Sequence, residues 1–133
     1  MDDKIDKQQL NKHQYQYSAQ CLAYMGDAVF EMHVRKRLLS YGNRPVNTLN
    51  KQARQYVSAT AQSKMYHYVE PFLTPEEQAV MRRGRNLHSE SKSKNANTLD
   101  YRHSTGLETL FGYLYVTDQQ DRLLTIFELC MEL

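Results

Sequence analysis

Apolar residues recur every three or four positions along most of this chain, and no stretch shows the regular alternation of paired strands. Within residues 18–39, the clearest positions of this kind are Leu22, Met25, Val29 and Phe30. This spacing predicts a helix. Other apolar side chains fill the remaining faces of that segment, which favours a central, buried helix. The chain is therefore predicted to be all-α.

Turn-forming residues divide the rest of the chain into further helices. A second helix is predicted over residues 48–70, and the sequence TPEE from Thr74 has the pattern of a capping box with proline at the first helical position. Two more helices are predicted, one from about Ser104 and one over residues 118–131. Residues 85–100 hold almost no apolar side chains and are predicted to form a long polar loop, which in a compact domain usually serves function.

A length of 133 residues suits one compact domain. Residues 1–17 are polar and are predicted to be a partly disordered N-terminal segment, followed by a single domain over residues 18–133. The N-terminal residues lack the apolar stretch of a secretory signal. No segment has the roughly 20 apolar residues that a membrane-spanning helix needs. We therefore expect a cytoplasmic protein that does not enter membranes.

Basic residues are concentrated in two segments, although the formal net charge is only +2. Residues 32–69 contain seven lysines and arginines and no acidic residue, and residues 82–103 contain six bases against two acids. A basic surface of this kind can follow a chain of phosphates, because neutralising phosphates releases counterions. The alternative is a charged helix face that only keeps the protein soluble.

Two acidic residues lie in strongly apolar helical segments, and this placement is unusual for structure alone. Asp27 stands between Met25 and Val29, and Glu108 stands among leucine and phenylalanine residues 81 positions later. Burying an ionised carboxylate is costly unless it is paired or binds a metal. Each acid could instead pair with a buried arginine or face water at the edge of a helix.

Carboxylates without thiolate or imidazole neighbours favour hard cations, so Mg²⁺ is the expected ion and Mn²⁺ a possible substitute. No two histidines have the spacing of zinc ligands. A hard divalent ion beside a basic surface suggests phosphodiester hydrolysis, in which the ion activates water and stabilises the leaving oxygen.

Two motifs carry a resemblance to a known family. Residues 22–32, LAYMGDAVFEM, resemble the signature helix of the ribonuclease III family, approximately ERLEFLGDAVLEL. Residues 105–115, TGLETLFGYLY, are similar to its second acidic motif, approximately DVFEALIGAIY. With RRGRN at residues 82–86 and YRHST at residues 101–105, the chain from about residue 18 onward most resembles Mini-III, the short members without a separate double-stranded-RNA-binding domain.

The resemblance implies roles for individual residues and a helical, ribonuclease III-like fold. Asp27 matches the catalytic aspartate and Glu108 the metal-binding glutamate, so both are predicted to be catalytic and to hold the metal. Ala23 stands where the signature has a metal-binding glutamate, and Thr105 where the second motif has an aspartate. The remaining acids are compatible with one firmly held Mg²⁺ ion. They are also compatible with a second ion that binds in addition, only when RNA is present.

The family forms a two-fold dimer in which an aromatic side chain docks into the partner, and Tyr24 matches that position. Tyr24 could equally be an ordinary core residue. Without a separate binding domain, the loop over residues 85–100 and its flanks are expected to bind duplex RNA. Lysine and arginine side chains would contact phosphates, and polar side chains would contact 2′-hydroxyls. The predicted RNA-binding residues are Arg83, Arg85, Asn86, Lys94, Asn95, Tyr101 and Arg102.

The resemblance therefore implies a Mg²⁺-dependent, homodimeric endoribonuclease that cleaves double-stranded RNA and leaves 5′-phosphate and 3′-hydroxyl ends. For Mini-III the implied substrate is the precursor of the large-subunit ribosomal RNA, with a ribosomal protein as a conceivable further partner. The rival hypothesis is a non-catalytic, dimeric RNA-binding or ribosome-associated module. The missing acids at Ala23 and Thr105 favour that rival, whereas the retention of Asp27 and Glu108 argues against it.

Overall fold

The computed structural model describes residues 17–88 and 96–133, and within them it is entirely helical, which confirms the predicted all-α class. None of the helices in those two ranges is long and apolar enough to cross a lipid bilayer. In chain order the elements are α2 (Ala19–Leu39), α3 (Val46–Val57), α4 (Ala59–Val69), η2 (Glu70–Phe72), α5 (Pro75–Arg85), η3 (Asn86–His88), α6 (Ala96–Val116) and α7 (Gln120–Met131).

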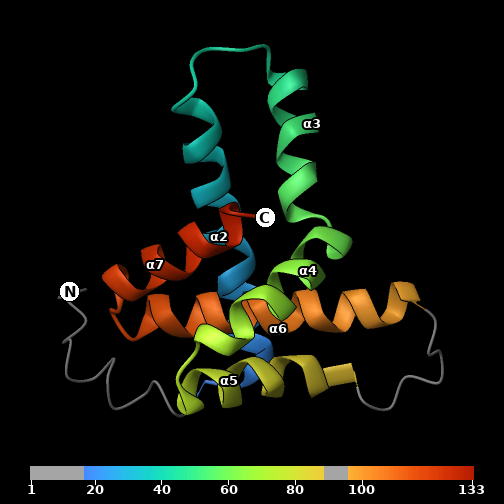
Figure 1. Ribbon diagram of the computed structural model, residues 1–133, viewed down its shortest axis with the longest axis vertical. Helices are drawn as coiled ribbons and strands as arrows, with labels where there is room; N and C mark the ends of the chain where they lie inside the picture. The colour runs from blue at the N-terminus through green and yellow to red at the C-terminus, as the bar shows by residue number, and fades with distance from the viewer. Residues whose placement is uncertain (1–16, 89–95) are drawn as a thin grey trace, which may run out of the picture.

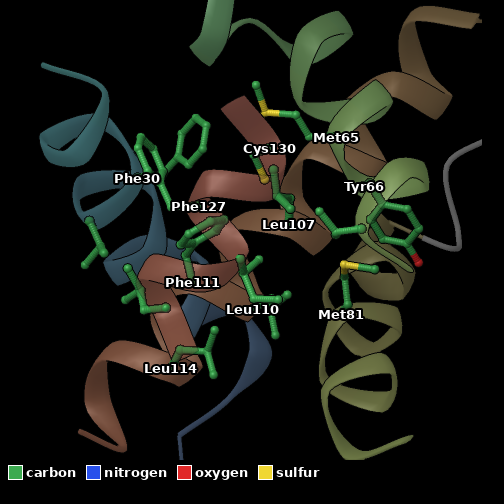
Figure 2. Close-up of a cluster of buried hydrophobic side chains, with 14 of the residues drawn as sticks. Phe30, Met65, Tyr66, Met81, Leu107, Leu110, Phe111, Leu114, Phe127 and Cys130 are labelled. Carbon is green, nitrogen blue, oxygen red and sulfur yellow. The ribbon is translucent and has the colours of Figure 1, made fainter. Parts of the chain in front are cut away.

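Helix α6 forms the centre of the fold, because α2, α4, α5 and α7 all pack against it (Figure 1). The C-terminal half of α2 extends beyond this group and packs beside α3 as a projecting helical hairpin (Figure 1). The core between the helices is a cluster of buried side chains that includes Phe30 of α2, Phe111 of α6 and Phe127 of α7 (Figure 2). Their rings pack edge to face or tilted, with centroids 5.2–6.4 Å apart.

Glycines allow α6 to approach its neighbours at backbone distance. A Cβ atom on Gly26 of α2 would overlap the backbone carbonyl of Glu108, and one on Gly112 of α6 would overlap the carbonyl of Leu22. On another side of α6, a Cβ on Gly84 of α5 would overlap the side chain of Thr109. Since any larger residue at these positions would separate the helices, the glycines fix how the residues beside them face one another.

Helix ends follow the sequence signals in most places. Ser18 caps α2 by accepting a hydrogen bond from the Cys21 amide, and Thr74 and Glu77 form the predicted capping box at the start of α5. The prediction of one helix over residues 48–70 was wrong. The backbone is extended at Ser58, whose hydroxyl accepts from the Ala61 amide and caps α4, so two helices replace one.

The long polar loop is shorter than predicted. Helix α5 runs through Arg85, η3 follows it, and α6 begins at Ala96, eight residues before the predicted start at Ser104. The first turns of α6 contain few apolar residues because they lie against α4 through polar contacts, such as the hydrogen bond from Thr60 Oγ1 to Asp100 Oδ2 (3.5 Å). Residues 89–95 of the predicted loop, and residues 1–16 of the N-terminal segment, lie outside the described residues.

Candidate active site

Helices α2 and α6 bring Asp27 and Glu108 together in one cleft, although the two residues are 81 positions apart in the sequence. The cleft has a volume of about 400 Å³. Its lining residues are Gln20, Ala23, Tyr24, Asp27, Leu87, Tyr101, Thr105 and Glu108. The close crossing at Gly26 and Gly112 produces this arrangement, because Asp27 directly follows Gly26 and the Gly26 Cα lies against the Glu108 backbone.

The two carboxyl groups interact directly. Burial, a side-chain hydrogen bond with Asp27 and the negative charge of Asp27 together raise the pKa of Glu108 to about 8. Burial is the largest of these causes, because removing a carboxylate from water disfavours its charged form. At neutral pH Glu108 therefore keeps its proton. A cation in the cleft would favour the ionised form instead.

Of the two structural alternatives for the acids, facing water at the edge of a helix holds for Asp27. Asp27 is exposed, whereas Glu108 is the partly buried member of the pair. Helix α2 is apolar nearly all round in sequence, but its residues Cys21, Tyr24, Ala28 and Met32 are exposed and form one open face. Glu31, one turn after Asp27, forms an ion pair with Arg35 (3.0 Å) instead of joining the cleft.

Pairing with a buried arginine was the other structural alternative for both acids. Within residues 17–88 and 96–133, neither Asp27 nor Glu108 forms an ion pair with a lysine, arginine or histidine. The described residues also contain no group of three or more histidine, cysteine, aspartate or glutamate side chains arranged to hold a metal. Ala23 and Thr105 line the cleft where two further carboxylates would have added ligands.

The donor set nevertheless fits a hard divalent cation. Mg²⁺ is commonly held by one or two carboxylates, with water and substrate phosphates completing its coordination. Asp27 and Glu108 supply two carboxylates in a cleft that is open to solvent and substrate. The Thr105 hydroxyl donates to the Tyr101 carbonyl (3.0 Å), so its proton is already used.

The predicted RNA-binding residues are divided between this cleft and a smaller pocket beside it. Tyr101 lines the cleft, and Arg83 is exposed on α5 and lines neither cavity. The smaller pocket, of about 210 Å³, is lined by Arg85, Asn86, Leu99, Arg102 and His103. Lys94 and Asn95 lie outside the described residues.

His103 was missed by the sequence-based prediction, which assigned it only to polar surroundings. It lies within YRHST, one of the motifs that carry the family resemblance, and four residues after Leu99. That spacing on a helix could have indicated that both residues face the same pocket.

Tyr24 is not a core residue. Its side chain is 83% exposed on the open face of α2, at the edge of the cleft. An aromatic side chain so fully exposed is suited to burial against another surface.

Comparison with known proteins gives one consistent family. Residues 20–119 match the Ribonuclease III domain. The chain is 47% identical over 107 residues to the Mini-ribonuclease 3 of Symbiobacterium thermophilum, covering 80% of this chain and 82% of that protein. It is 40% identical over 113 residues to the Mini-ribonuclease 3 of Streptococcus pneumoniae, covering 84% of this chain and 88% of that protein.

One solved structure gives the same result for the fold. A crystal structure of a Fusobacterium nucleatum protein superposes with a TM-score of 0.75 at 28% sequence identity. The match covers 87% of this chain and 93% of that one.

Proposed function

Since the chain belongs to the ribonuclease III family and is an endoribonuclease, we propose that it is a Mg²⁺-dependent enzyme that cleaves double-stranded RNA at the cleft between α2 and α6. The observation that carries this proposal is the direct interaction of Asp27 and Glu108, with no basic side chain of the described residues neutralising them. Two carboxyl groups held together in this way are better suited to a cation than to stabilising the fold.

Asp27 and Glu108 would hold the divalent cation, and Mn²⁺ would be able to replace Mg²⁺. When bound, the cation supplies charge stabilisation for the reacting phosphate and activates water. The exposed Asp27 carboxylate is open to both the cation and the RNA, whereas partly buried Glu108 must lose its proton before it can ligate. Tyr101 and Leu87 also line the cleft.

We propose that residues 18–133 form the catalytic domain and that it acts as a homodimer through the open face of α2. The exposed stripe on that face consists of Cys21, Tyr24, Ala28 and Met32, which are small or apolar residues at helical spacing. Docking of Tyr24 into a second copy would bury its ring. Because Tyr24 also borders the cleft, this contact would place two cleavage sites on one duplex.

Following the resemblance to Mini-III, we propose as substrate duplex RNA in the precursor of the large-subunit ribosomal RNA, processed in the cytoplasm. Arg83, Arg85, Asn86, Tyr101 and Arg102 are the described residues proposed to contact the duplex, together with Lys94 and Asn95. A ribosomal protein is a possible further partner on this substrate.

Cleavage of a labelled RNA duplex tests the proposal. With Mg²⁺ we expect shorter products with 5′-phosphate ends, which a 5′-phosphate-dependent exonuclease then degrades. We expect no products with a chelator, from single-stranded RNA or from duplex DNA. A duplex that is bound but never cleaved with Mg²⁺ or Mn²⁺ would contradict the proposal and support the non-catalytic module.

A further inference from the structure

A group of basic and hydrogen-bonding side chains lies outside the two-carboxylate cleft and has no part in the proposed chemistry. The smaller pocket is lined by Arg85 at the end of α5, Asn86 of η3, and Arg102 and His103 of α6. It adjoins the cleft, because Leu87 and Tyr101, the chain neighbours of Asn86 and Arg102, line the cleft itself. The Arg85 Nε–H donates to Asn86 Oδ1 (3.2 Å), which holds part of this set in place.

His103 is fixed in one orientation at this pocket. Its Nδ1 lies 2.8 Å from the Leu99 carbonyl oxygen and therefore carries a proton that it donates to that oxygen. Nε2 of the neutral ring is then an acceptor, and protonation of the ring turns Nε2 into a second donor. The ring packs against Tyr66 and His67 of α4, with centroids 4.7 and 4.4 Å away.

Most of the titratable groups that act on His103 are basic. His67 faces it from α4 and Arg85 from α5, whereas Asp100 on α6 is the acidic group that acts on it. Burial, His67 and Arg85 lower the pKa of His103, and the Leu99 hydrogen bond and Asp100 only partly offset them. Free His103 is therefore neutral at pH 7, and an anion in the pocket would favour its charged form.

Tyr66 provides a second, independent indication. Its hydroxyl oxygen is buried, and within residues 17–88 and 96–133 no group accepts its proton. Figure 2 shows this oxygen at the edge of the core, turned away from Leu107 and Phe111. Arg85 and Arg82 both act on the hydroxyl, so it lies among basic groups. A buried hydroxyl without an acceptor is rare in folded proteins, and Arg85, which acts on this one, lines the smaller pocket.

We propose that Arg85, Arg102 and His103 form a phosphate-binding site for the backbone of the duplex, separate from the cleavage site, and that protonation of His103 strengthens it. The inference rests on the proposed function, because the anion is a phosphodiester of the RNA substrate. One additional charged contact to a phosphate should make RNA affinity more dependent on salt. The slope of the logarithm of the affinity against the logarithm of the salt concentration should become steeper by about one.

Duplex RNA binding in the presence of a chelator tests the site. We expect the wild-type protein to bind an RNA duplex about fivefold to tenfold more tightly at pH 5.5 than at pH 7.0, as one additional hydrogen bond would produce. Both pH values lie below the pKa of about 8 for Glu108, so its ionisation does not contribute. His103→Gln should remove most of this pH dependence and lower the salt slope at pH 5.5 by about one.

His33 provides a matched control. Its Nδ1 lies 2.8 Å from the carbonyl oxygen four residues before it, as in His103, but its ring packs against Phe127 on a different side of the fold. His33→Gln should keep the wild-type pH dependence and salt slope. In NMR titrations, the pKa of His103 should rise when the duplex is added, and the ring signals of His33 should not change.

The outcomes separate this site from the proposed function. If the wild-type protein cleaves duplex RNA but His103→Gln keeps the full pH dependence, the phosphate site is wrong and the nuclease proposal stands. If the wild-type protein neither binds nor cleaves duplex RNA, both are wrong. Thermal unfolding of each variant shows whether a loss of binding comes from a loss of folded protein.

Discussion

Gly26 and Gly112 meet backbone to backbone where α2 crosses α6: a Cβ atom on Gly112 would lie 3.0 Å from the Gly26 nitrogen and would overlap the Leu22 carbonyl. No side chain separates the two helices at this point. The residue after Gly26 is therefore held against the turn of α6 that carries Glu108. The contact between the two acids depends on this crossing.

Replacing Gly26 by alanine should separate the helices and destabilise the protein by about 3 kcal/mol or more, because the new methyl group meets backbone that cannot move aside. Urea unfolding followed by circular dichroism measures the loss. Gly42→Ala is the control: nothing lies within 4 Å of its Cβ position, and only its φ of +115° is unfavourable to alanine. We expect a loss of about 1 kcal/mol there. Equal losses at both positions would contradict the packing argument.

Asp27→Asn should abolish cleavage, by at least about a thousandfold in rate, because one of two proposed metal-holding carboxylates loses its charge. Initial rates on a labelled duplex with Mg²⁺ provide the measurement. Glu31→Gln is the matched control, since Glu31 lies on the same helix but pairs with Arg35. It should retain close to wild-type activity. Full activity of Asp27→Asn would rule out the proposed role of the acid pair.

Binding of Mg²⁺ should become tighter as the pH rises towards 8, because Glu108 must lose its proton to ligate and its pKa is about 8. Below that pH, binding should release up to one proton per site. Calorimetry at pH 7 in two buffers of different ionisation enthalpy measures the release. In Glu108→Gln the proton release should disappear and the affinity should fall. Proton-independent binding in the wild-type protein would contradict the pKa shift.

The same shift predicts how stability changes with pH. Between pH 4.5 and 8 the folded protein keeps a proton on Glu108 that the unfolded chain has lost, so folding stability should fall as the pH rises through this range. Glu108→Gln should flatten the fall, which we expect to be about 1–2 kcal/mol because the cleft admits water. Unfolding free energies at several pH values, without divalent metal, test this. A steeper fall in the variant would contradict it.

Tyr24→Arg should convert a homodimer into monomers, because it places a charge on the open face of α2. Sedimentation velocity gives the oligomeric state. Leu124→Arg is the control, since Leu124 is an exposed apolar residue (45%) on α7, away from that face. It should leave the assembly unchanged. A wild-type protein that is already monomeric at all concentrations would overturn the proposed dimer.

Local signals were sufficient to predict the helical class and several helix ends. The capping box at Thr74 depends only on residues within one turn, so it could be predicted from the sequence. The break at Ser58 could not be predicted, because the apolar spacing continues through it. The early start of α6 could not be predicted either, because its first turns show no apolar periodicity. A polar contact between Thr60 and Asp100 joins them to α4.

The identity of the acid pair came from the sequence, but its environment did not. Periodicity did not decide whether Asp27 is buried, because it does not distinguish an apolar face that packs in the core from one that is left open. Similarly, His103 gave no signal, because its importance comes from α4 and α5, which are distant in sequence. Contacts of this kind depend on how the helices cross.

One straight helix, α6, carries both Glu108 and His103. The two residues are five positions apart, which is roughly 7.5 Å along the axis at about 1.5 Å per residue. Helix α6 therefore sets the separation between the proposed phosphate site and the acid pair, and inserting one residue between them would rotate one relative to the other by about 100°.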